Sequence, residues 1–263
     1  MKRVLTLCAD DYGQSAAIDR GILRLLAQAR LSQVSCLANG PAWAADAAAL
    51  ARTGVQAGLH FNLTEGRPLS AALARLWPRL PGLQTLLVQA HLGRLPLDAL
   101  RQELQAQWQA FEQALGRPPI HLDGHQHVHH LPQIRQLVLE QLAAQPRFKV
   151  RHTGRVRGPG YLVKRTLIEG TGGRALGRQL QALRRQANDT LQGVYDFSEP
   201  DYRCLMQGWL RALPAAGGMV FCHPGEPGDD TGDAIAAARA RELAYLDSPD
   251  FAADLANAEV RLA

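Results

Sequence analysis

The sequence predicts an α/β fold, most simply a distorted or incomplete (β/α) TIM-like barrel. Short apolar runs alternate along the chain with segments in which apolar residues recur at helical spacing, and this alternation is typical of parallel β/α units. Polar clusters follow the ends of these runs, which is where the active site of such a barrel gathers. A chain of 263 residues suits one domain over residues 1–263, because these barrels commonly run to roughly 200–250 residues.

Each expected element has a local reason. Strands are expected where apolar runs end in polar or turn-forming residues, at 4–9, 34–38, 55–63, 120–128, 148–152 and 218–222. Helices are expected where apolar residues recur at helical spacing, at 15–29, 42–52, 97–115, from 132 onward, and at 178–191, 199–213, 235–247 and 250–258. Ser15 and Ser198 are expected to cap the helices that they precede. The stretches 67–95 and 154–177 are expected to form loops with short or irregular helices.

The composition is that of a globular protein. With 46% hydrophobic and 20% charged residues, the chain can bury a core. The apolar run near Met1 is too short for a signal peptide, and no stretch approaches the length of a transmembrane helix. The cysteines Cys8, Cys36, Cys204 and Cys222 form no CxxC pair, so we expect free, mostly buried thiols in a reducing cytoplasm.

Positive charge is concentrated in one segment. Residues 147–185 contain eleven Lys or Arg and one acid, Glu169, so the segment carries +10 and the remainder −5 of the total of +5. Such a segment could bind nucleic acid, anionic lipid headgroups or phosphorylated substrates. A solvated arginine-rich helix with its loops is the simpler interpretation, and the absence of interleaved aromatic residues weakens the nucleic-acid option.

The densest group of metal-capable side chains lies in the middle of the chain. Residues 121–130 read His-Leu-Asp-Gly-His-Gln-His-Val-His-His and hold five of the nine histidines. An extended backbone would place alternate residues on one face, namely His121, Asp123, His125, His127 and His129. Several neutral imidazoles beside a carboxylate, where a strand gives way to a loop, are what a divalent cation selects.

Other strand ends add complementary groups. Asp10 and Asp11 are consecutive, so both can face one centre only if the backbone bends there, and Gly13 permits such a bend. His60 and His223 also lie at the ends of predicted strands. Together with a central histidine, these side chains supply two imidazole ligands, a carboxylate ligand, a base and an acid. Three ligands with open positions are typical of a catalytic metal site.

Five motifs carry a family resemblance. They are Ala9–Gly13 (ADDYG), Asn39–Pro41 (NGP), Gly58–Gly66 (GLHFNLTEG), His121–His129 (HLDGHQHVH) and His223–Gly225 (HPG). In this order they resemble the YdjC-type carbohydrate deacetylases, the family of ChbG-like and HpnK-like proteins. The match is strong from residue 4 to about residue 152, and it is thinner afterwards except at His223–Gly225.

The resemblance implies a fold, an activity and a set of site residues. The fold would be a distorted (β/α) barrel of the glycoside hydrolase/deacetylase type, and the enzyme would use a divalent metal to remove an N-acetyl group from an amino sugar. Asp10 would be the general base, and Asp11, His60 and His125 would be the metal ligands. His223 is the candidate for the acid that protonates the leaving amine.

The other polar residues of the central stretch are expected to support this site. His127 and Asp123 are expected to orient the ligands, a role that metal ligands generally require of their neighbours. His121, His129 and His130 are expected to be structural.

The expected reaction is metal-assisted amide hydrolysis. The metal lowers the pKa of a bound water toward about 7 and polarises the acetyl carbonyl. Asp10 completes the deprotonation as the water attacks, an acid protonates the nitrogen, and acetate leaves. The resemblance implies Mg²⁺ first. Two histidines and a carboxylate suit Zn²⁺, Mn²⁺, Fe²⁺ or Co²⁺ at least as well.

Two alternative functions remain open. A hydrolase of another bond, such as a glycosidic linkage, would keep the barrel and metal, although that chemistry usually needs two flanking carboxylates. A non-catalytic, metal-stabilised glycan- or nucleic-acid-binding protein would use segment 147–185. The expected partner is a small N-acetylated sugar, chitooligosaccharide-like or lipid-linked, and not nucleic acid. The sequence does not indicate an oligomeric state.

Overall fold

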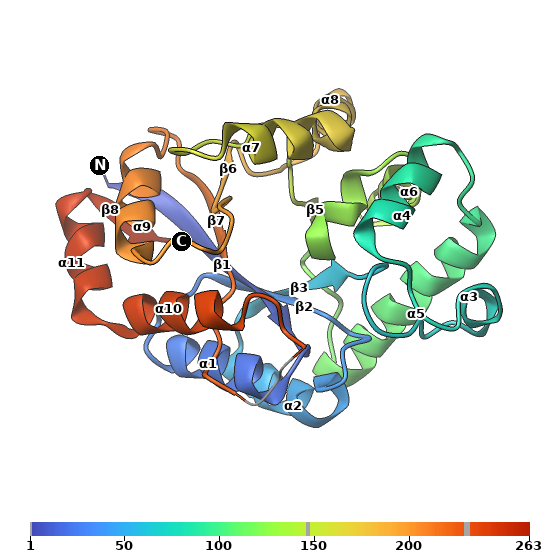
Figure 1. The fold of residues 1–263 in the computed structure, drawn as a ribbon, viewed down its shortest axis with the longest axis horizontal. Helices are drawn as coiled ribbons and strands as arrows, with labels where there is room; N and C mark the ends of the chain where they lie inside the picture. The colour runs from blue at the N-terminus through green and yellow to red at the C-terminus, as the bar shows by residue number, and fades with distance from the viewer. Residues whose placement is uncertain (1, 146–147, 229–231) are drawn as a thin grey trace.

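Eight strands form one sheet at the centre of the molecule (Figure 1). The computed structural model describes residues 2–145, 148–228 and 232–263, so Arg147 of the basic segment lies outside the described residues. The strands are β1 (Arg3–Tyr12), β2 (Gln33–Cys36), β3 (Gln56–Phe61), β4 (His121–Gly124), β5 (Lys149–Val150), β6 (Leu191–Gln192), β7 (Gly218–Cys222) and β8 (Val260–Leu262). Neighbouring strands follow the order β5-β4-β3-β2-β1-β7-β6, and β8 pairs with the start of β1.

The helices alternate with these strands along the chain. They are α1 (Ala16–Ala27), α2 (Trp43–Thr53), α3 (Ala71–Leu76), α4 (Leu83–His91), α5 (Leu97–Leu115), α6 (Ile134–Ala144), α7 (Leu162–Ile168), α8 (Arg174–Ala182), α9 (Tyr202–Arg211), α10 (Ala236–Asp247) and α11 (Pro249–Asn257). A 3₁₀ segment, η1 (His125–His130), follows β4, and a π-helical segment, η2 (Glu169–Gly173), joins α7 to α8. None of the described helices is long and apolar enough to cross a membrane.

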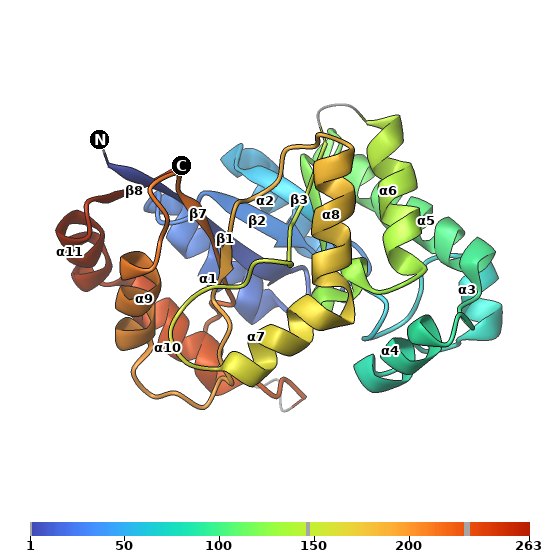
Figure 2. The same cartoon turned by 90° about the horizontal axis from the view of Figure 1, so that it is seen from above.

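The sheet is parallel and curls into part of a barrel. Strand pairs are parallel throughout the described sheet. Helices α6, α5, α2, α1 and α10 contact one another in that order, following the curve of the strands (Figures 1 and 2). β5 and β6, the two end strands, do not pair with each other in the described sheet. Among the described residues, a single isolated β-bridge, between Val156 and Leu191, connects the segment after β5 with β6. The predicted α/β architecture is therefore confirmed as a curled half-barrel, and a complete barrel is not formed.

The first strand lies in the interior of this sheet, between β2 and β7. Leu5, Leu7, Cys8 and Ala9 of β1 are all fully buried, as expected for a strand that is covered on both faces in a parallel sheet. The N-cap predicted for the next helix is confirmed, because the Ser15 hydroxyl accepts a hydrogen bond from the Ile18 amide at 3.3 Å.

The cysteines behave as predicted. Cys8, Cys36 and Cys222 are buried in β1, β2 and β7, and Cys204 is exposed on α9. All four are free thiols.

The central histidine stretch is only partly extended. β4 ends at Gly124, and Gln126 and His127 in η1 have left-handed φ angles of 52° and 62°. The predicted alternation of residues 121–129 on one face is therefore wrong beyond Gly124. The physical reason is that strand pairing ends there: β3 pairs with β4 as far as Gly124, and β5 pairs with β4 only at His121 and Leu122.

Three other expectations are wrong in the second half of the chain. The helix expected at 178–191 ends at Ala182, and β6 begins at Leu191, because the backbone there pairs with β7. Asp201 rather than Ser198 caps α9, accepting a hydrogen bond from the Cys204 amide at 2.9 Å. β8 was not expected, since a three-residue strand is too short to show a period.

Candidate functional site

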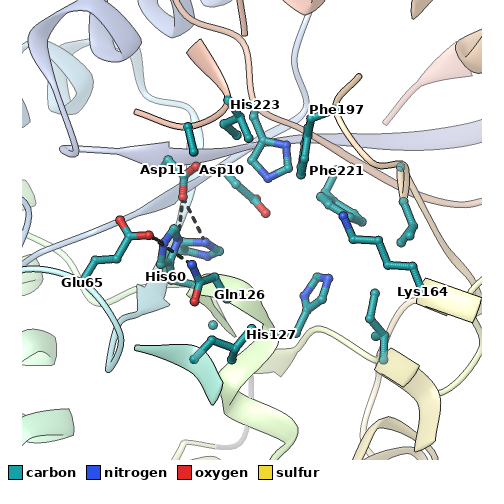
Figure 3. Close-up of a pocket in the computed structure, with 18 of the residues that line it drawn as sticks. Asp10, Asp11, His60, Glu65, Gln126, His127, Lys164, Phe197, Phe221 and His223 are labelled. Carbon is teal, nitrogen blue, oxygen red and sulfur yellow. Dashed lines mark hydrogen bonds and ion pairs between the residues drawn. The ribbon is translucent and has the colours of Figure 1, made fainter. Parts of the chain in front are cut away.

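A cavity of about 560 Å³ opens where the strands end. Its wall includes all five side chains that the sequence singled out for chemistry. Figure 3 shows four of them, Asp10, Asp11, His60 and His223, around the cavity. The five are Asp10 and Asp11 at the end of β1, His60 on β3, His125 after β4, and His223 after β7.

A backbone bend lets both aspartates reach this cavity. Asp11 itself has a left-handed φ of 71°, and the pairing of β1 with β2 shifts register between Ala9 and Tyr12. The bend predicted at the two aspartates is therefore present, and Gly13, with a φ of 95°, continues the turn. A non-glycine residue in this conformation is uncommon, and such strain often marks a functional position.

Asp11, His60 and His125 form a compact group of potential metal ligands. One Asp11 oxygen, Oδ1, lies 2.9 Å from His125 Nδ1 and 3.4 Å from His60 Nε2. All three residues are buried, and each offers a ligand atom within 4.8 Å of the other two. This is the ligand set that the family resemblance implied.

The electrostatics of these residues suit a cation. Burial alone would lower the pKa of His60, but the carboxylates of Asp123 and Asp10 outweigh burial and raise this pKa to about 10. Burial likewise opposes protonation of His125, yet the Asp11 carboxylate raises its pKa to about 9. The carboxylates therefore hold positive charge on the two imidazoles, and a divalent cation would take the place of those protons.

The chemistry of the donor set provides a second test of fit. His125 Nδ1 faces Asp11, and the opposite ring nitrogen, Nε2, lies 3.2 Å from Glu65 Oε1. Two imidazoles and a carboxylate with a second carboxylate nearby are a suitable donor set for a divalent metal.

Asp123 orients one of the histidines. Asp123 Oδ1 lies 2.6 Å from His60 Nδ1, which directs the opposite ring nitrogen of His60 toward Asp11. The other Asp123 oxygen accepts a hydrogen bond from Ser35 at 2.6 Å. Asp123 therefore has the contacts that its predicted supporting role requires.

Arg151 is the most important residue that the sequence did not indicate. Its fully buried guanidinium donates to both oxygens of Asp10, at 2.7 Å each, and lies 2.5 Å from Asp123 Oδ2. Two further clusters of metal-capable residues surround this guanidinium, one of Cys8, His121 and Asp123 and one of Asp10, His60 and Asp123. In these clusters Arg151 contacts both oxygens of Asp10 and one oxygen of Asp123. The group around Asp11 is the better candidate for a metal, because the arginine that holds Asp11 contacts Oδ2 and not the Oδ1 atom that faces the two histidines.

A second arginine holds the other oxygen of Asp11. Arg239 on α10 donates from Nη2 to Asp11 Oδ2 at 2.8 Å and from Nε to Asp233 at 2.6 Å. Burial would raise the pKa of Asp11, but Arg239 and His125 outweigh burial and hold this pKa well below its usual range. The carboxylate is therefore anionic, with Oδ1 left facing the two histidines.

His223 is positioned by aromatic rings and a buried acid. Its ring lies edge-on to Phe197 and Phe221, with centroid distances of 5.3 and 5.5 Å. Glu242, fully buried on α10, accepts a hydrogen bond from the His223 amide at 2.6 Å and lies 3.9 Å from His223 Nδ1. Glu242 also accepts a hydrogen bond from the Tyr195 hydroxyl at 2.5 Å.

The remaining histidines differ in their contacts. His127 lines the cavity, but its ring packs edge-on against Phe221 and its buried Nδ1 has no hydrogen-bond partner, so it does not orient the ligands as expected. The other three make structural hydrogen bonds, as predicted. His121 bonds with Ser35 at 2.9 Å, His129 with the Arg151 carbonyl at 3.0 Å, and His130 with Thr153 at 2.8 Å and with Thr171 at 3.1 Å.

The outer part of the cavity is mainly apolar and carries one cation. Figure 3 shows Lys164 of α7 extending into the cavity opposite the aspartates. Its ammonium group donates to the Tyr195 carbonyl at 2.6 Å and lies 4.6 Å from the centre of the Phe197 ring. Aliphatic side chains of α4 and α7 complete this part of the wall, namely Leu83, Leu87, Leu167 and Ile168.

The residues missed by sequence reasoning had weak signals. Arg151 lies near the end of the strand expected at 148–152, so its place at a strand end was visible, but it lay among many other arginines. Arg239 and Glu242 lie in a helix, and nothing in the sequence distinguishes their buried side chains from those of a solvated face.

Comparison with known proteins provides independent information. The family model described as YdjC-like protein matches residues 4–257. A carbohydrate deacetylase of Homo sapiens is 38% identical over 146 residues, which are 53% of this chain and 45% of that protein. A chitooligosaccharide deacetylase of Serratia marcescens is 39% identical over 140 residues, covering 52% of this chain and 55% of that protein. The alignments thus cover about half the length of these relatives.

One solved structure shares the fold over the whole chain. A crystal structure from Enterococcus faecalis V583, described as a candidate cellobiose-phosphate cleavage protein, superposes with a TM-score of 0.77 and 18% sequence identity. The match covers 100% of this chain and 97% of that one. At this identity the likeness concerns the fold alone.

Proposed function

The chain belongs to the YdjC-like protein family, and from this premise we propose that it is a metal-dependent hydrolase that removes the N-acetyl group of an amino sugar and releases acetate. The observation that carries the proposal is the group of Asp11, His60 and His125 in one cavity that also contains Asp10 and His223. Relatives named carbohydrate deacetylase and chitooligosaccharide deacetylase support the same reaction class.

In this proposal Asp11, His60 and His125 hold the metal. When bound there, a divalent cation supplies activation of the attacking water and polarisation of the acetyl carbonyl. Asp123 keeps His60 in the orientation that leaves Nε2 free, and Arg239 keeps Asp11 turned toward the histidines. The resemblance implies Mg²⁺, whereas this ligand set suits Zn²⁺ at least as well.

Asp10 and His223 carry the proton transfers. Arg151 fixes the plane of the Asp10 carboxylate through two hydrogen bonds, so the base is held in place before the substrate arrives. Asp10 accepts the proton of the attacking water, and the His223 ring donates a proton to the departing nitrogen. The buried Glu242 positions His223 by accepting a hydrogen bond from its backbone amide at 2.6 Å.

A panel of N-acetylated sugars, assayed for released acetate with several divalent metals, tests the reaction. We expect acetate release that a chelator abolishes and that metal restores. Elemental analysis of protein purified without chelator identifies the resident metal. Full activity of the metal-free protein would refute the metal-dependent reaction.

Matched histidine variants test the ligand assignment. His125→Ala should abolish tight metal binding, whereas His129→Ala, which removes a histidine of the same stretch, should retain it. Asp10→Asn should bind metal but lose activity by at least about 10²-fold, the lower range for a general base. Equal loss of metal affinity in both histidine variants would contradict the ligand set, and an active Asp10→Asn variant would contradict the base.

A further inference from the structure

The basic segment forms a separate structural feature. Its described residues, 148–185, comprise β5, a loop, α7, η2 and α8, and we call them the basic arm. Figure 1 shows α7 and α8 along one edge of the molecule, with α1, α2 and α10 on the opposite side of the sheet. In Figure 2, which looks onto this edge, the two helices lie in front of the sheet. Apart from Arg151, the charged residues of this arm have no part in the ligand group or in the proton transfers.

The basic arm presents an excess of positive charge to solvent. It contains ten Lys or Arg and one acid, and Arg151 is the only one of these that is buried in the site. The acid, Glu169, already pairs with Arg174 at 2.8 Å. Further exposed cations are Lys149, Arg155, Arg157, Arg178 and Arg184. An anionic surface within a Debye length of about 8–10 Å would be attracted by all of them together.

Large aliphatic side chains are exposed on the same arm. Leu162, Val163 and Leu167 of α7 are 68%, 75% and 59% exposed. On the other side of the cavity mouth, Val88 of α4 and Leu92, which directly follows this helix, are 53% and 58% exposed. Both helices also line the cavity, so its mouth is bordered by apolar residues on two sides. Exposed aliphatic side chains on a surface that also carries exposed arginines are typical of a protein surface that inserts into the headgroup region of a membrane.

We propose that the basic arm and the exposed face of α4 dock onto an anionic lipid bilayer, with the mouth of the cavity toward the lipid. A second copy of this chain is a poorer occupant, since a symmetric contact would bring two basic arms together. Nucleic acid is also a poorer occupant, because the exposed apolar residues of α7 are aliphatic and offer no rings on which bases could stack. An anionic bilayer accounts for both the positive charge and the exposed aliphatic residues, because its headgroups attract the arginines and the aliphatic side chains enter the interface.

This inference does not depend on the proposed reaction. Docking uses the outer surfaces of α7, α8 and α4, and it requires neither metal nor catalysis. Vesicle binding can therefore fail while the deacetylase activity holds, and the reverse is equally true.

Sedimentation with vesicles tests the proposal directly. The full chain should bind vesicles that contain phosphatidylglycerol and should bind pure phosphatidylcholine vesicles far more weakly. Binding to the anionic vesicles should weaken as salt is raised from about 0.05 M to about 0.5 M. Failure to bind anionic vesicles at the lower salt concentration would overturn the proposal.

A pair of double variants tests the apolar contribution. Leu162→Ser with Val163→Ser should reduce affinity for the anionic vesicles by at least about tenfold, which corresponds to about 1.4 kcal/mol. Leu69→Ser with Leu76→Ser is the matched control, because these exposed leucines lie at and near α3, outside the basic arm. The control should bind as the unaltered chain does. Equal affinity of all three proteins would overturn the proposal.

Charge reversal provides an independent test if the serine variants do not fold. Arg178→Glu with Arg184→Glu should also abolish most vesicle binding. Arg52→Glu with Arg211→Glu changes the net charge equally on α2 and α9 and should retain it. Binding of a single-stranded oligonucleotide more tightly than the vesicles would assign the arm to nucleic acid and overturn the proposal.

Discussion

Replacing Arg151 separates the stabilising and positioning roles of the most buried cation in the site. Its side chain is fully buried and contacts two carboxylates, Asp10 and Asp123. Arg151→Met would leave both acids in the interior without their cation. Removing one partner of a buried ion pair costs about 3–5 kcal/mol, so we expect the free energy of unfolding to fall by at least this amount.

Arg151→Lys provides the sharper test of catalysis. Lysine keeps the positive charge but cannot donate to both oxygens of Asp10 in the fixed geometry of a guanidinium. The Asp10 carboxylate would then rotate away from its position, and misplacement of a reacting group by about 1 Å can cost on the order of 10²-fold in rate. We therefore expect kcat for acetate release to fall by about 10–100-fold while metal affinity changes little.

Two control variants distinguish this effect from general damage. Arg239→Lys alters the residue that holds Asp11, so it should weaken metal affinity by about 10–100-fold, as changes beside a metal ligand typically do. Arg101→Met breaks an exposed pair with Glu140 and should leave the free energy of unfolding nearly unchanged.

Urea unfolding, calorimetric metal titration and acetate release measure the three quantities. An Arg151→Lys enzyme with kcat within about twofold of the unaltered enzyme would refute the positioning argument. An Arg151→Met protein of unchanged stability would refute the ion-pair argument.

Two further predictions concern stability. Burial lowers the pKa of His130 to about 2, so the folded state keeps this ring neutral while the unfolded state binds a proton below pH 6.5, and stability must fall as the pH falls. Between pH 7 and pH 5 this residue should lower the free energy of unfolding by about 2 kcal/mol. Urea unfolding of His130→Gln should no longer show this loss. If the variant kept the same pH dependence of stability, the assignment to His130 would be wrong. A Cβ atom at Gly58 would lie 2.3 Å from His121 Nε2, so Gly58→Ala should lower the unfolding temperature through a cost of about 1–3 kcal/mol. Gly82→Ala, where a Cβ meets no atom within 4 Å, should be nearly neutral, and equal effects of the two changes would argue against steric crowding.

Much of the fold could be predicted because its signals are local. The helix at 97–115 and the strand at 218–222 were predicted with the boundaries that the structure has. Both are long or regular enough for their apolar period to be clear. The π-helical joint at Glu169–Gly173 and the three-residue β8 were not predicted, since neither carries a period of its own.

The sequence by itself determined the chemistry that this chain brings together. It placed two aspartates and three histidines at the ends of predicted parallel strands, and such ends meet at one edge of a sheet whatever the details of packing. The family and its implied ligand set followed from the motifs at those same positions.

Only the tertiary structure decided how these residues are held. Arg151 lies 141 positions from Asp10, and Arg239 lies 228 positions from Asp11, so no local pattern could connect either pair. The end of strand pairing at Gly124 likewise decided which central histidines face the cavity. The physical reason is the same in each case: burial and the direction of a charged side chain depend on which distant elements pack against it, and the period of a sequence records only its neighbours along the chain.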